Sequence, residues 1–131
     1  MTLPATEGLR FRAVWLPIGW LLVVLVVWGT LTPSPPGTLA VGGDKLAHVV
    51  AYLVLALWFG GLYSGAARGA HALGLAVMGV GLEFLQEAGG VRQLEAADMF
   101  ANGLGVFLGW FLSRFPALSV VGRLDRTLDS L

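Results

Sequence analysis

The stretch AVWLPIGWLLVVLVVWGTL, residues 13–31, carries no charged side chain and is long enough to cross the hydrocarbon core of a membrane as a helix. Pro17 falls in its first turns, where a missing backbone N–H costs a helix least. Arg10 and Arg12 give it the basic start that is typical of a signal peptide. Its apolar run, however, is longer than the roughly 7–15 apolar residues of a signal peptide. The stretch therefore predicts an uncleaved membrane-spanning helix.

The composition of the whole chain agrees with a membrane location. Of its 131 residues 56% are hydrophobic and 12% charged, and the mean hydropathy is +0.79, whereas soluble domains carry about 25% charged residues. The net charge is zero without any basic tract, which argues against a nucleic-acid partner. The absence of cysteine excludes disulfides and thiolate metal sites. We therefore expect an integral membrane protein with one domain, residues 1–131.

Three further apolar segments follow the first, and turn-forming residues separate them. TPSPPG at 32–37 cannot continue a helix, and SGAARG at 64–69 and GGVRQ at 89–93 mark two more breaks. We therefore predict an all-α fold, an integral membrane four-helix transmembrane bundle. Residues 117–131 alternate apolar and charged positions, which predicts a short amphipathic helix on the membrane surface. The predicted spans are about 13–31, 44–63, 70–89 and 95–113.

The distribution of basic residues predicts how the bundle is oriented. If the N-terminus is cytoplasmic, only Lys45 and Arg92 fall on the far side of the membrane. The basic residues on the cytoplasmic side are then Arg10, Arg12, Arg68, Arg114, Arg123 and Arg126. Cytoplasmic loops of membrane proteins carry such an excess of Lys and Arg. We expect a multi-pass protein of the bacterial inner (cytoplasmic) membrane with both termini in the cytoplasm.

Polar side chains gather in the predicted outer halves of the second, third and fourth spans. Asp44, His48 and Tyr52 recur every four residues and therefore share one helix face, as do Asp98 and Asn102. An ionised side chain in hydrocarbon costs at least about 2.5–3.5 kcal/mol, so these groups need partners or water. We predict that they line one wet cavity beneath the outer headgroups. The cavity residues are Asp44, Lys45, His48, Tyr52, Glu83, Gln86, Arg92, Asp98 and Asn102.

The residue types in this cavity allow acid–base chemistry. His48, Glu83 and Asp98 are the predicted catalytic residues, because imidazole exchanges protons near neutral pH and burial favours a protonated carboxyl. The remaining six are predicted to bind substrate, with Lys45 and Arg92 as a cationic clamp for phosphate. Without a His-x-x-x-His or Cys pair no metal site is predicted, and ligation of a divalent metal by the three catalytic candidates is the less favoured variant. The sequence identifies no cofactor.

The same residues carry a resemblance to the VanZ family of integral membrane proteins, which is associated with teicoplanin resistance. The resemblance is carried by DKLAHVVAY (44–52), EFLQ (83–86), Arg92 and DMFANGLGVFLG (98–109), and covers about residues 12–115. QLEAA at 93–97 departs from the small polar residues that related chains often have there. The resemblance implies a role in the cell envelope, without a settled reaction. The implied family positions are the nine cavity residues and Gly105.

Two functional hypotheses follow. In the first, the VanZ-like protein binds or modifies an envelope lipid or a lipid-linked cell-wall precursor in its extracytoplasmic polar pocket, in association with glycopeptide resistance. Catalysis and simple binding both stay open here. In the alternative, the chain is a non-enzymatic accessory or structural subunit of a larger membrane complex, and its polar cluster holds the bundle together.

Overall fold

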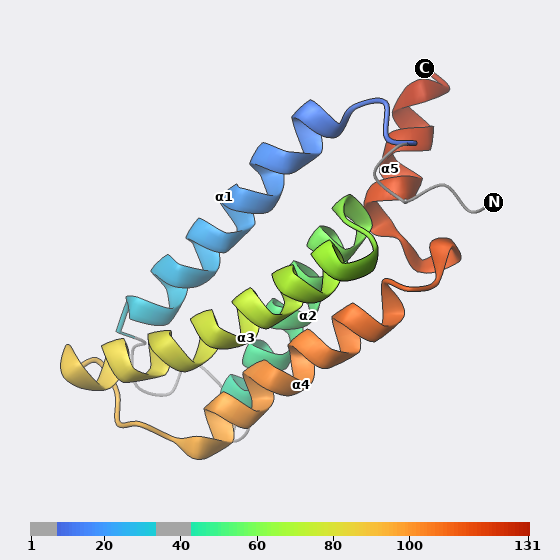
Figure 1. Cartoon of the computed structure of the whole chain (residues 1–131). Coiled ribbons are helices and arrows are strands. Elements are labelled where there is room, and N and C mark those ends of the chain that lie inside the picture. Colours follow the sequence, from blue (N-terminus) through green and yellow to red (C-terminus); the bar gives the residue numbers. More distant parts are fainter. Residues whose placement is uncertain (1–7, 34–42) are drawn as a thin grey trace.

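The computed structural model describes residues 8–33 and 43–131, and within these ranges the fold is all-helical (Figure 1). The helices are α1 (Arg12–Leu31), α2 (Gly43–Leu62), α3 (Gly65–Ala88), α4 (Ala96–Leu112), a 3₁₀ turn η1 (Pro116–Leu118) and α5 (Val120–Asp129). Helices α1, α2 and α3 are long and apolar enough to cross a membrane, and α4 is apolar but shorter, with 17 residues. The all-α prediction is confirmed. The predicted proline turn lies mostly outside the described residues, at positions 34–37.

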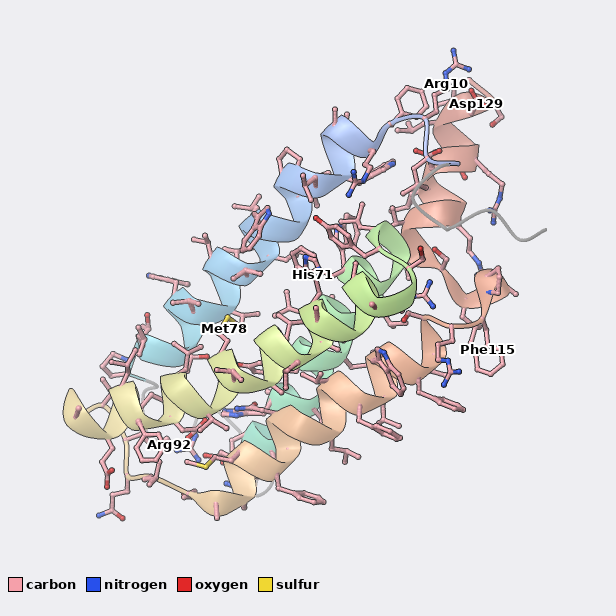
Figure 2. All side chains as sticks on the ribbon, in the orientation of Figure 1. Arg10, His71, Met78, Arg92, Phe115 and Asp129 are labelled. Atoms are coloured by element: carbon pink, nitrogen blue, oxygen red, sulfur yellow. The ribbon has the colours of Figure 1, made fainter. Side chains whose placement is uncertain are left out.

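Helices α1 to α4 run alternately up and down, and the site lies where two helices end and two begin (Figure 1). The ends of α1 and α3 meet the starts of α2 and α4 at what is here called the polar end. The opposite end holds α5 beside the start of α1, and is called the α5 end. Figure 2 shows this separation, because Arg92 marks the polar end whereas Arg10 and Asp129 lie together at the α5 end.

The third helix begins earlier than the sequence predicted, at Gly65 rather than near residue 70. Only Tyr63 and Ser64 separate it from α2. Gly65 has a left-handed backbone (φ 55°), which glycine adopts without steric cost, so the reversal needs no longer loop. The alanines and arginine that follow are good helix formers. The predicted break after the second span is therefore present but shorter than predicted, because α2 ends at Leu62 and residues 65–69 form the first turns of α3.

The most extensive helix–helix contact in the described chain joins α2 and α4. It depends on two glycines of α4 spaced by four. A Cβ at Gly105 would collide with the Val49 carbonyl and lie 3.1 Å from Leu53 N, and one at Gly109 would lie 2.6 Å from Leu53 O. Glycine at these positions lets the two backbones touch, as small residues do between membrane helices. This contact fixes the polar side chains of α4 against those of α2.

The predicted C-terminal helix is present as α5, but it packs against protein as well as presenting an apolar edge. Val121 is fully buried, and its Cβ would lie 3.1 Å from a side chain added at Gly61 of α2. Leu124 and Leu128 are 40% and 39% exposed, which leaves apolar surface outside the protein contact. One face of α5 therefore packs against the bundle, and the other exposes apolar side chains.

Asp125 of α5 caps the start of α1, which has no side-chain cap of its own. Its two carboxylate oxygens accept hydrogen bonds from Arg10 N (2.9 Å), Phe11 N (2.9 Å) and Trp15 Nε1 (2.7 Å). Burial raises the pKa of this carboxyl, but the hydrogen bonds from Trp15, Phe11 and Arg10 outweigh burial, so its net pKa lies below the ordinary value. The α5 end is thus held by one well-satisfied buried carboxylate.

Candidate functional site

The polar end is shaped by the way α3 terminates. Gly90 takes a left-handed backbone (φ 66°), and the N–H groups of Gly90 and Val91 donate to the carbonyls of Glu87 and Gln86 at 3.0 and 2.9 Å. These two bonds form a Schellman motif, which reverses the chain at a helix end. The reversal carries Arg92 back over the end of the bundle, towards the first turns of α2 and α4.

Five charged residues meet there and are called the ionic cluster: Asp44, Lys45, Arg92, Glu95 and Asp98. The Lys45 ammonium lies 2.6 Å from Glu95 Oε2 and 2.7 Å from Asp98 Oδ1. Arg92 Nη2 lies 2.5 Å from Asp44 Oδ2 and 3.3 Å from Asp98 Oδ2. The Asp98 side chain has no exposed surface, and its contacts are ion pairs without hydrogen-bond alignment. Each cation of the cluster therefore already faces carboxylates.

This pairing changes the predicted role of the two cations. The hydrogen bond with Asp44 raises the pKa of Arg92, and the hydrogen bond from Lys45 lowers the pKa of Glu95. A phosphate clamped by Lys45 and Arg92 would have to displace these carboxylates. Glu95 was not among the predicted site residues. Its spacing of three residues from both Arg92 and Asp98 was the available signal in the sequence.

Beneath the ionic cluster lies the buried triad, defined as His48, Glu83 and Asp98. One nitrogen or oxygen of each lies within 4.8 Å of the others. His48 Nδ1 is 3.0 Å from Asn102 Oδ1 and 3.7 Å from Glu83 Oε1. Glu83 is 1% exposed, and within the described chain neither of its carboxylate oxygens has a hydrogen-bond partner. Three helices therefore bring together an imidazole and two buried carboxylates, as the spacing predicted.

The triad and Asn102 offer the ligand types that bind divalent cations, and His48 with Glu83 also forms a pair able to exchange a proton. The structure shows their proximity. Their catalytic roles stay predictions.

A groove of about 650 Å³ runs beside the triad, between α1, α2 and the end of α3. Leu22 and Leu25 of α1 and Val54 of α2 are among its apolar walls, and Asp44 and Arg92 lie at its polar end. The predicted site residues that line it are Asp44, His48, Tyr52, Gln86 and Arg92.

The nine predicted cavity residues therefore occupy two adjoining regions rather than one cavity. Glu83 and Asp98 are absent from the groove lining, whereas His48 lines the groove and also belongs to the triad. The sequence also missed the contribution of α1. Gln86 Nε2 donates to the carbonyl of Thr30, which ties the end of α3 to α1. Residue spacing shows which side chains share a face, but not that another helix covers that face.

Fold and site together define a helical protein with three helices of membrane-spanning length and a charged cluster around the buried Asp98 at one end of the described bundle. No family model, curated protein or solved structure matches the chain.

Proposed function

We propose that this chain is a four-span, VanZ-like protein of the bacterial inner membrane that binds an envelope lipid or lipid-linked cell-wall precursor. The observation that carries the proposal is the groove at the polar end, with apolar walls along its length and charged groups at one end. Lipids have the same division into apolar chain and polar head. Binding sites of this kind are concave, mostly apolar and supplied with a few convergent polar groups.

The four-span arrangement takes α4 as the fourth membrane helix. Its 17 residues give a length of about 25 Å, at the lower limit for crossing a hydrocarbon core. The basic residues of the α5 end, Arg10, Arg12, Arg68 and Arg114 among them, favour a cytoplasmic location for that end. The polar end then faces the outer leaflet, both termini are cytoplasmic, and the groove opens where envelope precursors are displayed.

Recognition of the lipid follows from the lining. The acyl chain lies along Leu22, Leu25 and Val54, and the headgroup meets Asp44 and Arg92. Modification of the bound lipid would use His48, because it is the triad residue that lines the groove. An association with glycopeptide resistance belongs to the same proposal, through the VanZ-like sequence blocks.

Lipid extraction from the purified protein tests the proposal. Ala51 lines the groove, and Ala51→Phe places a ring in the path of the acyl chain. Ala66→Phe is the matched control, because Ala66 is exposed in the first turn of α3 at the other end of the bundle. We expect wild type and Ala66→Phe to retain a lipid in stoichiometric amount through detergent washing, and Ala51→Phe to lose it. Equal retention by all three proteins, or no enriched lipid in any, would overturn the proposal.

A second candidate is a non-enzymatic subunit of a larger membrane complex. It is supported by a row of aromatic side chains on the outer face of α4, where Phe107 stacks on Phe111 with 6.3 Å between ring centroids. Phe100, Phe107 and Phe111 are 75%, 56% and 42% exposed. A stoichiometric partner co-purifying with wild type but not with a Phe107→Ala variant would favour this function over the first.

A further inference from the structure

Within the described bundle, Glu83 and Asp98 both bury carboxylate oxygens that have no hydrogen-bond partner, but Asp98 has ion pairs with Lys45 and Arg92 whereas Glu83 has no such pair with Lys or Arg. Its side chain has no exposed surface, and both oxygens lack a hydrogen-bond partner. A buried charge left without a partner costs several kcal/mol, and buried charges in proteins are therefore paired or bound to metal. The nearest basic group is His48 Nδ1, at 3.7 Å from Oε1. Among the residues that the structure describes, no Lys or Arg forms an ion pair with Glu83.

The charge balance of the ionic cluster and the buried triad, taken together, also calls for a cation. They contain the carboxylates of Asp44, Glu83, Glu95 and Asp98, and the permanent cations Lys45 and Arg92. Four negative charges against two positive ones leave two negative charges when the carboxylates are ionised and His48 is neutral. One divalent ion would restore neutrality.

We propose that a divalent transition-metal ion binds between His48, Glu83 and Asp98, with the amide oxygen of Asn102 as a fourth ligand. The three triad atoms lie within 4.8 Å of one another, so an ion at their centre reaches each with a small side-chain movement. His48 Nδ1 and Asn102 Oδ1 are 3.0 Å apart, close to the spacing of two neighbouring ligands held about 2.1 Å from one ion. Imidazole and carboxylate ligands together suit Zn²⁺ or Mn²⁺.

The ion would give the groove a way to hold an anionic headgroup, and in this respect the inference rests on the proposed function. Lys45 and Arg92 are neutralised by carboxylates, so they offer little free positive charge to a phosphate. An ion bound to His48 stands at the border of the groove, since His48 lines it. An anionic lipid headgroup could then complete the coordination from the groove side.

Direct ion binding tests the inference. Purified protein is stripped with a chelator in detergent and titrated with Zn²⁺ or Mn²⁺ by calorimetry. We expect wild type to bind about one ion per chain. Loss of a residue that only supports a metal ligand weakens binding by about 10–100-fold. Glu83 is proposed as a direct ligand, so Glu83→Gln should bind at least tenfold more weakly. Glu87→Gln is the matched control, since Glu87 lies one turn further along α3 and is exposed. It should bind like wild type.

A spectroscopic measurement covers the case in which Glu83→Gln does not fold. With Mn²⁺ bound, electron spin echo spectra should show a nitrogen coupling that His48→Gln abolishes and His71→Gln retains, because His71 lies on the first half of α3, away from the triad. Folded wild type without saturable binding, or binding that Glu83→Gln leaves unchanged, would overturn the inference. If the chelator-treated protein retains lipid but binds no ion, this inference is contradicted and the proposed function is not. If the protein binds an ion but retains no lipid, the proposed function is contradicted and this inference is not.

Discussion

Asp125 at the α5 end and Glu83 near the polar end are both carboxylates with almost no exposed surface, at 4% and 1%. Asp125 accepts three hydrogen bonds and caps the start of α1, whereas Glu83 accepts none in the described structure. Burial costs a satisfied carboxylate little and an unsatisfied one several kcal/mol. The comparison indicates that Asp125 holds the fold together, and it agrees with our proposal that Glu83 serves a bound ion.

Asp125→Ala is expected to have the largest effect on stability. It removes the acceptor of three donors and the cap of α1, and should lower the free energy of unfolding by about 2–4 kcal/mol. Chemical unfolding in detergent micelles measures the loss. Asp129→Ala is the control, because Asp129 forms an ion pair with Arg10 on the surface, where such a pair contributes about 0–1 kcal/mol. Equal losses of unfolding free energy in the two variants would contradict a structural role for Asp125.

At the polar end, stability is expected to come from backbone contact rather than from the polar groups. Gly105→Ala forces α4 away from α2 and should cost about 1–3 kcal/mol. Gly103→Ala, on the same helix, meets nothing within 4 Å and should leave stability unchanged or raise it by up to about 1 kcal/mol. Thermal unfolding followed by circular dichroism separates the two. If Gly105→Ala were as stable as Gly103→Ala, the close contact of α2 and α4 would not matter.

The two ends should also differ in their response to acid. The native pKa of Asp125 lies below its ordinary value, so its contribution to stability is fully present above the unfolded carboxyl's pKa of about 3.9. That contribution is lost as the pH falls through the lower native pKa. We expect the acid-induced loss of stability to be smaller in Asp125→Asn than in wild type. Thermal unfolding midpoints between pH 7 and pH 3 measure this, and parallel curves would contradict it.

Much of the helical frame could be predicted from the sequence, because apolar length and turn residues mark helices directly. The spacing of four along α2 and α4 correctly placed His48 and Asn102 on faces that meet. The early start of α3 was not predicted, because a left-handed glycine, Gly65, allows the chain to reverse without the longer loop that we expected.

Contacts between distant elements could not be predicted in the same way. The cap by Asp125 joins residues separated by more than a hundred positions, and periodicity in α5 shows only that it is amphipathic. For the same reason the sequence did not show that α1 forms one wall of the groove. The spacing of residues within α1 does not reveal which helix packs beside α1. Glu95 was missed because a charge at a helix start is usually solvated.

The central claim is that the unsatisfied carboxylate serves binding and the satisfied one serves the fold. The most direct test compares two isosteric changes, Glu83→Gln and Asp125→Asn, by free energy of unfolding and by retention of ion and lipid. We predict that Glu83→Gln unfolds like wild type, or at higher denaturant, and loses binding, whereas Asp125→Asn loses stability and keeps binding. If Glu83→Gln loses as much stability as Asp125→Asn and binds like wild type, the account is contradicted.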